Sequence, residues 1–253
     1  MKRTIIYIAL LLVSVVAYGA EPTSLERWEA GNKAYIEGNY EKAVEDYNAI
    51  LDGGEYSMKL YYNLANAYFK MGNIGKSILY YNKALRIAPS QEDIRHNLAL
   101  AEAQTKDRIA VIPEFFLNRW LRTVRNSMSC TAWSVLSLVC FGVLLAFGVL
   151  FLLASNVRWR KVGFYGALCA FVLFVATTSF AVSSRNDILS HNEAVVMGTA
   201  ISIKSSPDRS ATDLFVLHEG TKVKVLTEVD EWVEVVIADG KKGWTLKSNV
   251  EEI

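Results

Sequence analysis

Aromatic rings and asparagine amides gather in the first hundred residues, and together they suit the binding of an extended peptide. Amides can satisfy the hydrogen bonds of a peptide backbone while rings cover its side chains. For any one of these rings, the alternative is ordinary packing between helices. The candidate binding residues are Trp28, Asn32, Tyr35, Tyr62, Asn63, Asn66, Phe69 and His96.

Side chains that could carry catalysis are few. The sequence contains three histidines, His96, His191 and His218, and none of them lies in a pattern that pairs a nucleophile with a base, cradles a phosphate or spaces metal ligands. The three cysteines, Cys130, Cys140 and Cys169, fall in or beside long apolar stretches, where cysteine behaves as a small hydrophobic residue. We therefore expect no enzyme, no metal site and no cofactor.

A repeat of 34 residues organises the segment that holds the binding candidates. Shifting the chain by 34 residues aligns Gly38-Asn39 with Gly72-Asn73 and Tyr47 with Tyr81. That period is the signature of tetratricopeptide repeats, in which two helices per repeat stack into an array. We expect two full repeats over about residues 24–87 and one further helix to about residue 109, within a domain of residues 23–110.

Capping and turn residues agree with this phase. Thr23 with Glu26 predicts a capping box at the first helix, and Ser90 with Asp93 is expected to cap the fifth. Gly38 and Gly72 allow the tight turn between paired helices. The tyrosines Tyr47 and Tyr81 are expected to fill the space between neighbouring repeats. So short an array needs the fifth helix, or another surface, to cover its end.

Some tetratricopeptide proteins hold a peptide C-terminus in a carboxylate clamp, and Asn32 and Asn63 match its asparagines. The basic residues of that clamp have no counterpart here, because Trp28, Asp93 and Asn97 stand at their positions. We therefore expect no C-terminal carboxylate ligand.

Two apolar stretches, residues 131–154 and 162–182, contain no charged side chain, and each is long enough to cross a bilayer. They predict a transmembrane hairpin over residues 131–182, which returns the chain to the side from which it entered. Arg158, Arg160 and Lys161 lie in the short connection, and the positive-inside rule places such a connection in the cytoplasm. Arg119, Arg122 and Arg125 on the opposite side weaken this bias.

Residues 1–19 have the pattern of a cleaved signal peptide, with Lys2 and Arg3 before an apolar run and Ala17-Tyr18-Gly19 at the cleavage site. The alternative is an uncleaved anchor. A signal peptide would send the following segment across the membrane, so we expect both soluble domains on the exported, periplasmic side of the inner membrane.

Residues 113–128 predict an amphipathic connector. Leu117, Trp120, Leu121 and Val124 recur at helical spacing with arginines between them, as in helices that lie in the headgroup layer of a bilayer. The alternative is an extension of the first membrane helix.

Residues 193–253 change to the alternating pattern of a half-buried sheet, with about five short strands that form a small barrel. Leu217-His218-Glu219-Gly220-Thr221 and Asp239-Gly240-Lys241-Lys242-Gly243-Trp244 resemble bacterial SH3 domains. The rings of Trp232 and Trp244 could present a surface for a peptide or glycan, or they could close the barrel core. The acidic balance of this segment, seven basic against eleven acidic residues, is unlike that of a nucleic-acid-binding domain.

The expected architecture is a multidomain membrane protein with an all-α tetratricopeptide array, a two-helix transmembrane hairpin and a small all-β SH3-like barrel. This domain order resembles the BatE-like proteins of the Bacteroides aerotolerance operon. The resemblance implies a non-enzymatic scaffold in the envelope beside membrane-anchored partners, some with von Willebrand factor A domains. The alternatives are a sensor that binds peptidoglycan in the cell wall and an accessory subunit of an envelope hydrolase.

Overall fold

The structure is a computed structural model that describes residues 22–110, 115–189 and 192–253. The predicted signal peptide (residues 1–19), the first two residues of the predicted connector and His191 lie outside the described residues. The chain divides into two compact units, Met1–Tyr56 and Ser57–Ile253.

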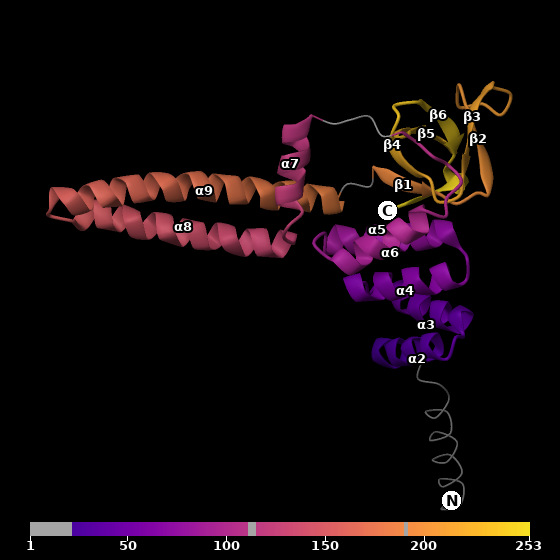
Figure 1. Cartoon of the computed structure of the whole chain (residues 1–253), viewed down its shortest axis with the longest axis horizontal. Coiled ribbons are helices and arrows are strands. Elements are labelled where there is room, and N and C mark those ends of the chain that lie inside the picture. The colour runs from indigo at the N-terminus through magenta and orange to yellow at the C-terminus, as the bar shows by residue number, and fades with distance from the viewer. Residues whose placement is uncertain (1–21, 111–114, 190–191) are drawn as a thin grey trace, which may run out of the picture. The chain divides into compact units, whose positions relative to one another are not determined.

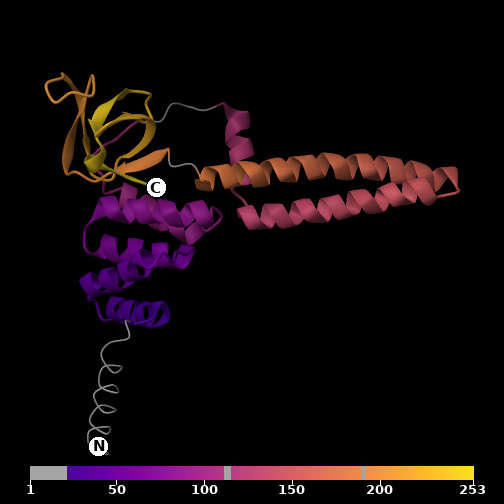
Figure 2. The same cartoon turned by 180° about the vertical axis from the view of Figure 1, so that it is seen from behind.

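Figures 1 and 2 show the helices and strands of the described residues. The helices of the described residues are α2 (Ser24–Ile36), α3 (Tyr40–Asp52), α4 (Met58–Lys70), α5 (Ile74–Ile87), α6 (Glu92–Glu102), α7 (Phe116–Arg125), α8 (Cys130–Leu153) and α9 (Val157–Leu189). The strands are β1 (Glu193–Val196), β2 (Ala200–Lys204), β3 (Asp213–His218), β4 (Lys222–Val229), β5 (Trp232–Val236), β6 (Lys242–Leu246) and β7 (Val250–Glu252).

The turns inside the two helix pairs are built alike. Gly38 and Gly72 adopt left-handed backbone conformations, with φ of +80° and +78°, as the sequence predicted. The next residue in each pair caps the second helix, because Asn39 Oδ1 accepts from Lys42 N and Asn73 Oδ1 accepts from Lys76 N, each at 3.1 Å. The Gly-Asn step therefore sets both the turn and the start of the next helix. The predicted capping box of Thr23 and Glu26 is also present.

Tyr47 packs inside its own helix pair. A Cβ atom at Gly31 would lie 2.7 Å from Tyr47 Cε1, so the glycine is what allows the ring to sit between α2 and α3. Tyr47 and Tyr81 are 0% and 1% exposed. Both rings are therefore buried, and the Tyr47 ring packs beside the small residue of its own repeat.

The fifth helix, α6, differs from its prediction at both ends. Its N-cap is Gln91, and no side chain caps it, so the cap expected from Ser90 and Asp93 does not form. The helix ends at Glu102, well before residue 109. The residues that follow contact the barrel, against whose core Ile109 packs.

Helices α8 and α9 are long and apolar enough to span a membrane. In the most apolar 18 residues of each helix, only 6% and 17% of the residues are buried. Such exposure is unlike the core helix of a soluble protein and suggests membrane insertion. The connection between them is shorter than expected, because α9 begins at Val157 and takes the basic residues into its first turns. Arg and Lys are good helix formers, which favours this early start.

A heptad of small residues joins the two long helices. The buried residues of α9 are Gly163, Ala170, Thr177 and Ser184, seven apart, which is the spacing of a left-handed helix pair. At Gly163 a Cβ atom would lie 2.6 Å from the backbone nitrogen of Phe151, so α8 passes close to the glycine. Ser137 and Thr178 share a hydrogen bond of 2.6 Å across the pair.

The strands of the described C-terminal residues form one antiparallel sheet in the order β3-β2-β6-β5-β4-β1-β7. Alternate side chains fill its core, among them Val196, Ile203, Leu217, Val223 and Val235. The sheet has seven strands, whereas the sequence predicted about five. The strands β1 and β7 are short and pair with each other.

The barrel contacts the start of α5 through Glu219. Its Oε1 atom accepts a hydrogen bond of 2.8 Å from Gly75 N, in the first turn of the helix, where the helix dipole favours a carboxylate. A Cβ atom at Gly75 would lie 2.8 Å from Glu219 Cγ and 3.3 Å from the Val196 carbonyl oxygen. Glycine therefore lets the barrel approach the helix backbone, and Lys76 adds an ion pair with Glu251.

Asp107 fixes the segment after α6 to the same barrel. Its Oδ2 atom accepts from His218 N at 2.7 Å and from Thr221 Oγ1 at 2.6 Å, and its Oδ1 atom lies 2.7 Å from His218 Nδ1. Burial acts to raise the pKa of Asp107, but the hydrogen bonds from Thr221 and His218 outweigh it and hold the pKa below its ordinary value.

We expect Asp107→Asn to lower the free energy of unfolding of the full chain by about 2 kcal/mol, because charge-assisted hydrogen bonds are lost from a carboxylate that is 15% exposed. Urea unfolding in detergent at neutral pH measures this. Since the pKa is lowered in the folded state, the contribution is present above the ordinary value of 3.8 and is lost as pH falls through the folded pKa.

Asp208→Asn is the matched control, because Asp208 also accepts from a backbone N–H and a hydroxyl, both of Ser210, but on an exposed loop within the barrel. An unfolding curve for Asp107→Asn that coincides with the control at neutral pH would show that this contact does not hold the barrel.

Candidate functional site

The two described repeats place their candidate binding residues in equivalent arrangements. In the first, the Trp28 ring lies 5.7 Å from that of Tyr47, and Asn32 Oδ1 accepts from Tyr47 Oη at 2.8 Å. Tyr35 lies at the end of the same helix, with its ring 5.4 Å from that of Tyr40. All three side chains, those of Trp28, Asn32 and Tyr35, are half-buried. Part of each side chain therefore packs within its own helix pair.

In the second repeat, 34 residues on, the Tyr62 ring lies 6.1 Å from that of Tyr81. Asn66 Oδ1 accepts from Tyr81 Oη at 2.5 Å, as Asn32 does from Tyr47 in the first repeat. The equivalent pairs show that Asn32 and Asn66 orient the buried tyrosines. Their amide oxygens are therefore used within the repeat, which the sequence reasoning did not foresee.

Helix α6 contributes one residue that was not among the binding candidates chosen from the sequence. Asn97 donates from Nδ2 to Tyr62 Oη at 3.0 Å and to Asn66 Oδ1 at 3.2 Å. It therefore links α6 to two of the candidate residues on α4. Its alignment with Asn63 at the 34-residue spacing was the signal that could have identified it.

The remaining candidates of the second unit differ in exposure. Tyr62, Asn63 and Phe69 on α4 are half-buried, whereas His96 on α6 is exposed. Since Asn97, the neighbour of His96, contacts α4, these residues lie on adjoining helices. Their mixture of rings and amides can contact an extended peptide, and no acid, base or nucleophile pair is formed by these candidates.

On the barrel, the two candidate tryptophans are placed differently. Trp232 is 7% exposed, so little of its ring can meet a ligand. Trp244 is half-buried on β6, where Lys204 of β2 and Glu234 of β5 are its neighbours across the strands. An ion pair of 3.0 Å between Lys204 and Asp213 lowers the pKa of that carboxyl. Trp244 thus offers a ring between a cation and a carboxylate.

The connector helix α7 presents an apolar face. Leu117, Trp120 and Leu121 are all exposed, with Trp120 at 58%. Its C-terminal end is tied to the start of α8, because Trp133 Nε1 donates to the Arg125 carbonyl oxygen at 2.8 Å. The exposed rings and the arginines of this helix are the side chains expected at a bilayer surface.

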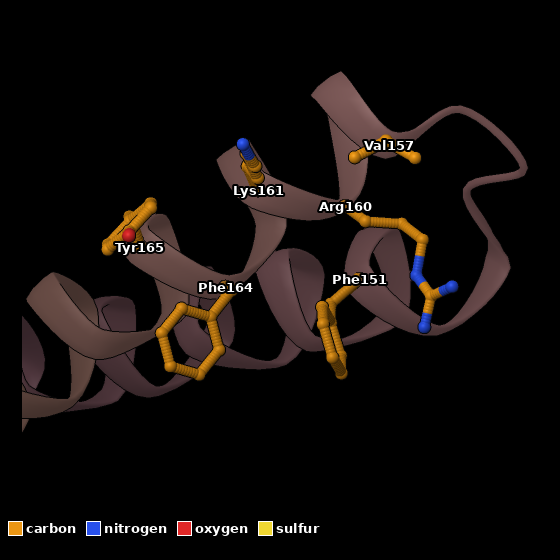
Figure 3. A pocket seen from close by; sticks show the side chains of 6 residues that line it. All are labelled: Phe151, Val157, Arg160, Lys161, Phe164 and Tyr165. Carbon is orange, nitrogen blue, oxygen red and sulfur yellow. The ribbon is translucent and has the colours of Figure 1, made fainter.

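A shallow hollow of about 330 Å³ lies where α8 and α9 are joined. Figure 3 shows Phe151 and Phe164 side by side, with the Arg160 side chain extending past Phe151. The Arg160 guanidinium lies 5.6 Å from the Phe151 ring centroid. Arginine stacked on an aromatic ring at the end of an apolar helix is suited to a membrane–water interface.

Two segments of the chain match known families. Residues 59–91 match the family model of the tetratricopeptide repeat, which falls on α4 and α5. Residues 199–251 match that of the bacterial SH3 domain, which takes in β2 to β7 apart from the last residue of β7. None of the curated proteins matches the chain. The chain therefore carries a tetratricopeptide repeat and a bacterial SH3 domain, joined by two long apolar helices.

Proposed function

We propose that the protein is a membrane-anchored, non-enzymatic scaffold that holds partner proteins at the exported face of the inner membrane. Both matched families are typically binding domains, and tetratricopeptide repeats usually bind proteins. The observation that carries the proposal is the contact between them, in which Gly75, Glu219 and Asp107 join the repeat helices to the barrel.

That contact favours a scaffold because it holds two binding surfaces at a fixed separation. A ligand that meets one surface is then at high effective concentration near the other, so weak contacts suffice. Insertion of α8 and α9 in the bilayer would add to this by confining both surfaces to the membrane. The resemblance in domain order to BatE-like proteins supports a role in a Bat-type stress-tolerance complex, whose von Willebrand factor A proteins are candidate partners.

The peptide surface of the second unit is tested with Phe69→Ala combined with His96→Ala, which spares the hydrogen-bonded set of Asn66, Tyr81 and Asn97. We expect about tenfold or greater loss of partner recovered from detergent extracts, because aromatic residues dominate binding at most interfaces. Mass spectrometry of the recovered partner establishes whether it carries a von Willebrand factor A domain.

The control for this experiment is Ile36→Ala, which removes an apolar side chain that is 84% exposed on α2. Circular dichroism confirms that each variant keeps its helices. Equal recovery by the wild type and the double variant would count against a binding surface on α4 and α6.

Peptidoglycan is a second candidate ligand, favoured by the half-buried Trp244 in a domain family that often binds cell walls. If the barrel binds the wall, detergent-solubilised full chain should sediment with purified peptidoglycan. Trp244→Ala should then leave most of the protein in the supernatant, while Trp159→Ala, which changes an exposed ring on α9, should sediment like the wild type. A wild type that stays in the supernatant limits the barrel to protein partners.

The proposed topology places Glu37 and Ser210 outside the cell and Ser155 inside. In a variant without the three native cysteines, single cysteines at each of these exposed positions report their own side of the membrane. A membrane-impermeant maleimide should label Glu37→Cys and Ser210→Cys in intact spheroplasts, but Ser155→Cys only after lysis. Labelling of Ser155→Cys before lysis would contradict the exported location.

A further inference from the structure

Six basic side chains line one cavity of about 680 Å³ within the second unit, a size typical of small-ligand sites. They come from three helices and one strand. The six are Arg86 of α5, Arg95 of α6, Arg122 and Arg125 of α7, and Lys222 and Lys224 of β4, with Ser184, Asn186 and Asp187 of α9 completing the wall.

The cavity keeps a positive balance after its internal ion pairs. Asp187 lies 2.7 Å from Arg125, and Glu193 lies 2.9 Å from Lys222. These are the two acidic side chains of the lining, so six basic against two acidic side chains leave a side-chain balance of +4. A concave surface with this charge attracts anions, and arginine forks bind phosphate oxygens in pairs.

Backbone oxygens hold part of this cluster in place. Arg86 donates to the carbonyl oxygens of Asp187 and Ile188 at 2.7 and 2.8 Å, and also to that of Ile253. Arg125 donates to Ser183 Oγ at 3.0 Å. The end of α9 is therefore fixed against α5 and α7, and the cations line the cavity without depending on an anion to gather them.

The lining residues of α9 begin just beyond its lipid-length apolar stretch. Val182 is the last residue of that stretch, so Ser184 to Asp187 lie about 3–8 Å further along the helix axis. Arg122 and Arg125 lie on α7, whose exposed Trp120 suits the membrane surface. In an inserted chain these residues meet the layer that contains the lipid phosphates.

We propose that this cavity binds the phosphate-bearing headgroup of an anionic phospholipid. The inference rests on the proposed membrane insertion. Juxtamembrane Lys and Arg side chains each contribute appreciably to the binding of anionic lipid, and here several of them surround one space. Bound lipid would hold α7, α9, the repeat helices and the barrel to one another at the membrane surface.

The test uses the full chain, purified in a neutral detergent, and the variant that combines Arg122→Gln with Lys224→Gln. Both side chains are exposed, so their replacement leaves the packing intact. Native mass spectrometry titrates bound phosphatidylglycerol, cardiolipin or phosphatidylcholine. We expect the wild type to prefer the anionic lipids, and the double variant to bind them about 30-fold more weakly.

Two controls separate lipid binding in the cavity from the effect of charge elsewhere on the protein and from the binding of phosphate alone. Lys70→Gln with Lys106→Gln removes two exposed cations outside the cavity and should keep the wild-type affinity. Inorganic phosphate should raise the midpoint of thermal unfolding far less than the anionic lipids do. Equal affinity in the two double variants, or equal stabilisation by phosphate alone, would overturn the lipid site.

Failure of membrane insertion has a different result. A chain that does not insert is released from membranes by alkaline carbonate. A chain that resists carbonate but binds phosphatidylcholine and phosphatidylglycerol equally well is anchored and lacks the proposed site.

Discussion

The close approach of the barrel to the first turn of α5 is the contact on which the arrangement of the second unit depends. It requires a helix N-terminus that lacks a side chain, and Gly75 provides one where any Cβ would meet Glu219 and the Val196 carbonyl oxygen. The carboxylate of Glu219 then takes a place that the helix dipole favours. The contact joins the backbone of the helix to a side chain of the barrel, and the absence of a side chain at Gly75 lets the two domains approach closely.

The same contact explains how so short a repeat array is covered. Stacked repeats generally need several units to bury a continuous core, and the described chain contains two helix pairs and α6. The barrel packs Gly220 against Ile74 and Ile78 of α5, and Ile109 after α6 packs on the barrel core. Apolar surface that a third repeat would bury is thus covered by a domain of another class.

Local sequence patterns predicted most of the helices and strands, but they did not predict the contacts between the domains. The 34-residue period, Gly38 and Gly72 predicted the helix pairs because they act over a few residues, and two charge-free stretches predicted α8 and α9. Asp107 and His218 are 111 residues apart, and nothing in either neighbourhood indicates the other. The cap expected at Ser90 is absent, because Ser90 lies in the turn after α5 and the helix begins after Gln91. The aromatic binding candidates were chosen from the sequence by residue type. The hydrogen bonds by which Asn32 and Asn66 orient tyrosines could be found only in the structure.

The fold brings together basic residues that lie far apart in the sequence. Cations that are scattered in the sequence, from Arg86 to Lys224, are brought to one cavity where α9 leaves its apolar stretch. Six cations repel one another, and the two acidic groups among the lining residues offset only part of that repulsion. An anionic ligand would offset more of it. A bilayer that contains anionic lipid would therefore stabilise the same joint that Gly75 and Asp107 form, so anchoring and the fixed spacing of the two binding domains would reinforce each other.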